Sequence, residues 1–160
     1  MVGDVMTEPM DAGTTLPVIP RLFTPEEADA LVQHLEASFR RMDPLLVRVR
    51  EIQDLLEDEA SYWGGDVSRA PPQDQAGHAA LAAELGRART VLDAEVSAVR
   101  ELGVEVKDVA MGLVDFYAQR DGDIVYLCWQ RGEPRVGHWH PLEGGFAGRR
   151  PLEPRRKGEP

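Results

Sequence analysis

Apolar residues recur every seven positions from Ala28 onward, and this spacing predicts a long helix with one apolar side. Two neighbouring rows share the period, so the apolar stripe is wide and extends to about Ala60. A sustained seven-residue repeat is typical of helices that pack against other helices, as in coiled coils. The clearest row consists of Ala28, Leu35, Met42, Val49 and Leu56.

The start and the middle of this helix carry their own signals. Thr24 and Glu27 have the spacing of a capping box, and Pro25 suits the first helical position. Pro44 lies inside the stripe, where a proline removes a backbone hydrogen bond and crowds the preceding turn. We therefore expect one helix with a kink near residues 40–43, or two helices end to end.

A second helix is predicted from about Gln73 to Leu102, after a loop containing two glycines and two prolines. Gly103 suits the left-handed residue that commonly ends a helix. Two long helices joined by one loop should pair antiparallel through their apolar stripes. The stripe of this second helix again has a period of seven: His78, Leu85, Leu92 and Val99.

The pattern after residue 110 changes to short runs rich in β-branched and aromatic residues. Asp121 and Gly122 form a strong two-residue hairpin signal. The sequence thus predicts an α+β protein, a helical hairpin followed by a three-stranded antiparallel meander. The expected strands are Leu113–Ala118, Asp123–Gln130 and Arg135–His140.

The expected turns also set which side chains share a face of this sheet. The first turn places Asp115 opposite Cys128. An even-numbered second turn places His138 and His140 on the apolar face that packs on the helices, away from Asp115. Trp139 then lies on the other face. A slip of one residue in either turn would invert this arrangement.

Length and composition fit one domain with a hydrophobic core, since the chain has 160 residues and is 42% hydrophobic. We expect residues 21–152 to form this domain. Residues 1–20, rich in proline, glycine and threonine, are predicted to be a flexible arm, and residues 153–160 a flexible tail.

Charge and residue usage exclude several classes of protein. The net charge of −10 argues against binding to nucleic acid or to an anionic membrane, because the basic residues gather only in the C-terminal tail. Cys128 is the single cysteine, so neither an intramolecular disulfide nor a cysteine zinc cluster is possible. No apolar run has the length of a membrane span, and the N-terminus lacks the features of a signal peptide. We expect a cytoplasmic protein.

His138 and His140 are the candidate metal ligands. Two residues apart on a strand, their side chains point to the same side, and neutral imidazoles can converge on one divalent ion. The alternative is that both are structural and hydrogen-bonded at the edge of the sheet. A third ligand would have to be a carboxylate, from Asp115, Glu133, Glu84 or Glu95.

Asp115, Glu133 and Arg149 are the candidate catalytic residues. Asp115 lies in an otherwise apolar strand, where a carboxylate beside a thiol and two tyrosines, Tyr117 and Tyr126, could work as an acid or base, or could simply hold a loop amide. The glycine-rich segment before Arg149 could bind an anion on its backbone N–H groups, or could be only a flexible exit from the sheet. Cys128 itself is interpreted as a small core residue.

A series of short motifs resembles the uncharacterised bacterial family catalogued as domain of unknown function 2203. The motifs are RLFTPEEADALV, LGVEVKD, GLVDF, LCW, GE, WH and GFAGR, and they extend from Arg21 to Leu152. The resemblance implies no activity. Tyr117 replaces the family's usual proline, and Pro141 replaces its usual acidic residue after WH. The family motif positions are Lys107, Asp108, Asp115, Cys128, Trp129, Glu133, Trp139, His140 and Arg149.

Two functions of different classes remain open at this stage. The first is an oligomeric structural or interaction module, with a homodimer favoured, because the small sheet cannot cover both helical stripes. The second is a small metal-binding protein or metal-dependent enzyme with one divalent ion at the C-terminal meander. The sequence does not decide whether the protein is an enzyme.

Overall fold

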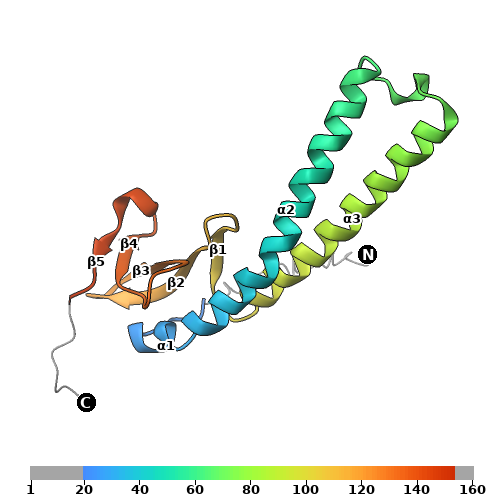
Figure 1. The fold of residues 1–160 in the computed structure, drawn as a ribbon. Coiled ribbons are helices and arrows are strands. Elements are labelled where there is room, and N and C mark those ends of the chain that lie inside the picture. The colour runs from blue at the N-terminus through green and yellow to red at the C-terminus, as the bar shows by residue number, and fades with distance from the viewer. Residues whose placement is uncertain (1–19, 154–160) are drawn as a thin grey trace, which may run out of the picture.

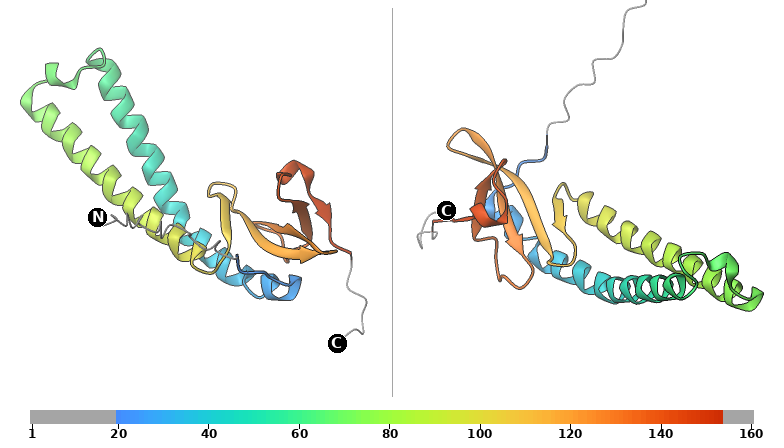
Figure 2. Two further views of the ribbon diagram at one scale, coloured as in Figure 1. Left: turned by 180° about the vertical axis from the view of Figure 1, so that it is seen from behind. Right: turned by 90° about the horizontal axis from the view of Figure 1, so that it is seen from above.

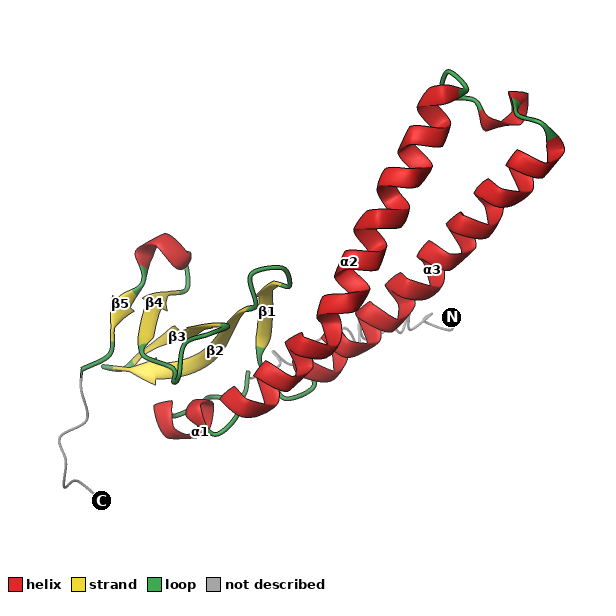
Figure 3. Ribbon diagram, viewed as in Figure 1, coloured by secondary structure: helices red, strands yellow, loops and turns green. Residues whose placement is uncertain are grey.

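A computed structural model describes residues 20–153 and shows a helical hairpin that projects from a small sheet (Figure 1). The predicted arm and tail lie almost wholly outside these residues. The two long helices extend away from the strands, whereas a short helix and a helical turn lie beside the sheet (Figure 3). The α-helices are α1 (Pro25–Asp29), α2 (Val32–Tyr62) and α3 (Pro72–Arg100), with short 3-10 turns at Val67–Arg69 and Phe146–Gly148. The strands are β1 (Glu105–Asp108), β2 (Leu113–Arg120), β3 (Asp123–Gln130), β4 (His138–Pro141) and β5 (Arg150–Pro151).

The predicted capping box starts α1. The Glu27 amide donates to Thr24 Oγ1 at 3.1 Å, and the Thr24 amide donates to Glu27 Oε1 at 3.3 Å. The prediction of an unbroken helix from this cap to Pro44 is wrong, because α1 ends at Asp29. A tight turn follows, in which the Leu31 amide donates to the carbonyl of Ala28 at 3.0 Å.

The antiparallel hairpin of α2 and α3 is confirmed (Figure 2). Helix α2 continues through Pro44 and is bent, as the missing backbone hydrogen bond at a proline predicts. Ion pairs link the helices along their length, Arg41 with Glu95 at 3.2 Å and Arg48 with Glu84 at 2.7 Å. Both carboxylates that were candidate metal ligands on α3 are therefore used to hold the hairpin together.

The sheet has five antiparallel strands in the order β1-β2-β3-β4-β5, where the sequence predicts three. The sequence does not predict β1 and β5. Strand β1 has four residues, most of them charged, and β5 has two residues, one of which is proline. One face of the sheet packs on the helices. The core between them includes Leu35, Phe39, Met42, Val96, Val99, Val114, Phe116, Leu127 and Trp129.

Three carboxylates spaced seven residues apart on α1 and α2 bind the segment 131–136, between β3 and β4. They sit beside the apolar stripe of the predicted heptad and fix the loop to the helices. Asp29 accepts from the Val136 amide at 2.8 Å, Glu36 from the Gly132 amide at 2.9 Å, and Asp43 from the Arg131 guanidinium at 2.6 Å.

This docked loop shifts the register of β4 by one residue from the prediction. The even-numbered turn expected from the sequence pairs Leu127 with His138, whereas the structure pairs Leu127 with Trp139 and Cys128 with His138. Gly132 adopts a φ of 97°, a conformation that favours glycine, and the turn gains one residue there. Because side chains alternate along a strand, one residue moves every β4 side chain to the opposite face.

Candidate metal centre

The outer face of the sheet, away from the helices, carries a row of ionisable side chains. The backbone register places Glu105 opposite Asp115, Asp115 opposite Cys128, and Cys128 opposite His138. His140 belongs to the same face, one pair further along, opposite Tyr126. The prediction that the histidines lie away from Asp115 is therefore wrong. Trp139 instead packs against the helix-facing core.

Asp115, Cys128 and His140 form a buried triad with one residue on each of β2, β3 and β4. Their exposed fractions are 2%, 0% and 3%. One potential ligand atom from each residue lies within 4.8 Å of the other two. His140 Nε2 is 3.1 Å from Asp115 Oδ2. These residues could hold a metal ion.

The hydrogen bonds of His140 define its protonation. Its Nδ1 lies 2.8 Å from the carbonyl oxygen of Pro141, and a carbonyl can only accept, so Nδ1 carries a hydrogen. In the neutral imidazole Nε2 then presents a lone pair toward the carboxylate of Asp115. Two acceptors facing each other require a proton or a cation between them. A backbone carbonyl that fixes Nδ1–H and leaves Nε2 free is also the usual arrangement of a metal-bound histidine.

The second carboxylate oxygen of Asp115, Oδ1, is buried and accepts no hydrogen bond from the described residues. Burial raises the pKa of Asp115, and the neighbouring His140 only partly opposes that effect. Since a buried carboxylate oxygen without a partner is costly, a positive charge beside Oδ1 would stabilise this site.

Cys128 is unsuited to act as a free nucleophile. Burial, followed by the nearby Asp115 carboxylate, raises the pKa of its thiol to about 12, so it stays protonated at neutral pH. Of the two His140 nitrogens, Nδ1 carries a hydrogen and Nε2 is directed at Asp115 at 3.1 Å. A bound cation would instead deprotonate the thiol and use it as a ligand.

Glu133, His138 and Arg149 form a separate cluster beside the triad. Arg149 Nη2 donates to the two oxygens of Glu133 at 2.6 and 2.8 Å and to His138 Nδ1 at 3.0 Å. The two remaining catalytic candidates thus lie together, but apart from Asp115. His138, predicted to share a metal with His140, is not part of the triad.

Two phenols, Tyr117 and Tyr126, lie on the same face as the sequence predicts, but their carboxylate partner, Glu105, was not predicted. Tyr117 donates to Glu105 at 2.5 Å and Tyr126 donates to Glu105 at 3.1 Å, while Lys107 also pairs with this carboxylate. Burial opposes ionisation of Glu105, but the hydrogen bonds from Lys107 and Tyr117 lower its pKa overall. Tyr117 is two residues from Asp115 along β2 and therefore shares its face. Glu105 was missed because β1, the strand that brings it to the tyrosines, was not predicted.

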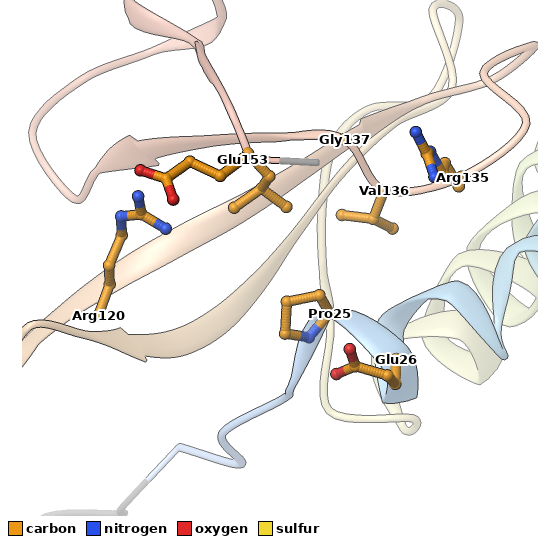
Figure 4. A pocket seen from close by; sticks show the side chains of 8 residues that line it. Pro25, Glu26, Arg120, Arg135, Val136, Gly137 and Glu153 are labelled. Atoms are coloured by element: carbon orange, nitrogen blue, oxygen red, sulfur yellow. The ribbon is translucent and has the colours of Figure 1, made fainter. Parts of the chain in front are cut away.

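A pocket of about 210 Å³ lies near the start of α1 and contains none of the triad. Figure 4 shows Arg120 and Arg135 on opposite sides of it, with Pro25 and Glu26 below. This pocket is separate from the triad, whose side chains are buried on the outer face of the sheet.

A family model described as an uncharacterized conserved protein, DUF2203, matches residues 21–152. The chain belongs to the DUF2203 family. This confirms the resemblance of the motifs over the same residues. No curated protein and no solved structure matches this DUF2203 chain significantly. Within residues 20–153, no helix of the protein has a stretch long and apolar enough to cross a bilayer.

Proposed function

We propose that this protein binds one divalent metal ion through Asp115, Cys128 and His140. The observation that carries the proposal is the convergence of three buried ligand atoms within 4.8 Å, one of them on a carboxylate whose other oxygen has no partner in the described part of the chain. A cation there would satisfy Asp115 and remove the conflict between its oxygen and His140 Nε2.

The ligand types favour zinc. A thiolate, an imidazole and a carboxylate are all common zinc ligands, whereas magnesium and calcium prefer sites made only of oxygen. At zinc–ligand distances of about 2.0–2.3 Å, two ligands of a tetrahedral ion are about 3.6 Å apart. The triad brackets that spacing, since His140 Nε2 and Asp115 Oδ2 are 3.1 Å apart and all three ligand atoms lie within 4.8 Å of one another, so small side-chain shifts would suffice.

The position of the triad supports a stabilising role for the ion. Each of β2, β3 and β4 contributes one ligand, so an ion would join three adjacent strands at the middle of the sheet. Three protein ligands leave one tetrahedral position for water or another group.

The test is zinc binding by chelator-treated protein. Wild-type protein should take up one equivalent of zinc, and its melting temperature should rise, since an ion at 100 times its Kd adds about 2.7 kcal/mol to stability. His140→Ala should lose both effects. His138→Ala is the matched control, because it removes an imidazole from the same strand and face but not from the triad. If zinc leaves the wild-type melting curve unchanged, the triad is only a structural hydrogen-bonded group.

We also propose that the helical hairpin mediates self-association, with a dimer as the favoured form. The supporting observation is exposed apolar surface on the hairpin, where Val47, Leu55 and Val91 are 58%, 47% and 51% exposed. Much of the hairpin extends beyond the sheet, which leaves this surface uncovered (Figure 2). A second copy of the chain would bury it.

Light scattering at micromolar concentration tests this second proposal. The expected mass is a multiple of the 17.7 kDa chain, and Val91→Glu should reduce it without unfolding the protein. Leu92→Asp should also disrupt assembly, but Leu92 packs against the monomer core, so that variant would lose stability as well. A wild-type mass of one chain would rule out the dimer.

A further inference from the structure

A second buried polar atom without a partner lies next to the triad. Among the described residues, the buried side-chain atoms that lack a hydrogen bond are Asp115 Oδ1 and Arg149 Nε. One is an acceptor and the other a donor, and Cys128 is close to both residues. Arg149 Nη2 is 3.5 Å from the Cys128 carbonyl oxygen, and Asp115 is the cross-strand partner of Cys128.

The guanidinium of Arg149 is held through its Nη2 and by an aromatic ring. Glu133 and His138 bind its Nη2, and the ring of Phe146 lies against it, with a centroid 4.8 Å from Cζ. Glu133 is fixed in turn, since its carboxylate accepts from the Gln130 amide at 3.2 Å. A buried N–H donor in so constrained a group needs an acceptor from its surroundings.

We infer that Arg149 is a positioning residue for the metal centre, whose Nε–H donates a hydrogen bond to the Cys128 sulfur when that sulfur is bound to the ion. This inference rests on the proposed metal site. A metal-bound thiolate carries far more negative charge than a thiol and is the stronger acceptor. His138, which Arg149 contacts at 3.0 Å, is the direct cross-strand neighbour of Cys128 on the same face, so the guanidinium lies on the sulfur's side of the sheet.

The charge of Arg149 acts on the sulfur in the required direction. Arg149 Nη2 is 3.5 Å from the Cys128 carbonyl oxygen, and a positive charge beside a cysteine favours the thiolate over the thiol. Groups that orient or polarise metal ligands from outside the first coordination sphere typically change metal affinity by about 10- to 100-fold.

Cobalt(II) titration of chelator-treated protein tests this role, because a cobalt–thiolate bond gives a charge-transfer band in the near ultraviolet. A hydrogen bond to sulfur stabilises its lone pair, so removing the bond should move the band to longer wavelength. Arg149→Lys keeps the positive charge but lacks Nε–H in that position. We expect a shifted band and a cobalt affinity about 10-fold or more below that of the wild type.

Glu133→Gln is the matched control. It removes the ionic partner of Arg149 and leaves Nε–H in place, so it should keep the wild-type band even if its melting temperature falls. A band and an affinity unchanged in Arg149→Lys would overturn the inference. An equal shift of the band in both variants would also overturn it, because that result assigns Arg149 only a structural role. If the wild type shows no thiolate band, the proposed metal site itself fails.

Discussion

Arg131 donates two hydrogen bonds to Asp43, from Nη1 to Oδ1 at 2.6 Å and from Nη2 to Oδ2 at 2.8 Å. This pair joins the end of β3 to the middle of α2. It is the strongest of the polar contacts that dock segment 131–136, because both partners are charged and the geometry is bidentate. The pair therefore connects the helical hairpin to the loop that sets the register of β4.

Asp43→Asn should lower the free energy of unfolding by about 1 kcal/mol at neutral pH, a modest loss because solvent screens a half-exposed pair. The hydrogen bond from Arg131 holds the pKa of Asp43 below its usual value, so the stabilisation is present above the unfolded pKa of about 3.9 and is lost as the pH falls through the lower folded pKa. Urea unfolding of both proteins at neutral and strongly acidic pH measures this. An equal difference at both pH values would contradict it.

Gly112→Ala should destabilise the protein more than Gly122→Ala. Both glycines have positive φ, 66° and 85°, so each substitution carries a backbone cost of about 1–2 kcal/mol. A Cβ on Gly112 would also lie 2.5 Å from Cβ of Arg131, whereas nothing lies within 4 Å of one on Gly122. Thermal unfolding of the two variants provides the comparison, and equal losses would show that this close approach is relieved at no cost.

Cys128 should resist thiol reagents in the folded, metal-free protein. Burial raises the pKa of its thiol to about 12 and its side chain is inaccessible, so labelling at about pH 8 should be complete only after unfolding. The raised pKa also stabilises the fold below the unfolded value of about 8.5, and this contribution is lost as the pH rises toward 12. Wild-type stability should therefore fall more steeply in alkali than that of Cys128→Ala. Rapid labelling of the native protein would be inconsistent with this burial.

Asp115→Asn should separate stability from metal binding. In metal-free protein the substitution removes a buried charge whose pKa is raised by burial, so the melting temperature should stay the same or rise. The same variant should lose the zinc-induced rise. Differential scanning calorimetry with and without zinc measures both. A large loss of stability in the metal-free variant would show instead that the ionised carboxylate, paired with His140, supports the fold.

The helices were predictable from sequence because their signals are local and repeated. The capping box at Thr24 and the seven-residue rows depend only on residues within a few turns of each other. Strand β1 depends on contacts that the chain makes much later, since Glu105 pairs with Asp115 and binds Tyr126. Its own four residues carry no alternation strong enough to reveal it.

The candidate site was predicted only in part, because Cys128 was interpreted as a core residue and His138 was named as a ligand instead. His140 and Asp115 were both named, but the register placed them on opposite faces. That register depended on the parity of one turn, which is set by Gly132 and by carboxylates on helices about a hundred residues earlier, such as Asp29 at 107 positions from Val136. The sequences of the strands alone therefore do not determine whether this turn has an odd or an even number of residues.

The carboxylates of Asp29, Glu36 and Asp43 connect the motion of the helical hairpin to the sheet. They are spaced seven residues apart on α1 and α2 and bind the loop that leads into His138 and His140. If the outer end of the hairpin moves relative to the sheet, either these contacts break or segment 131–136 moves with the helices. A force on the helical hairpin would therefore act on β4, the strand that contributes the imidazole of the triad.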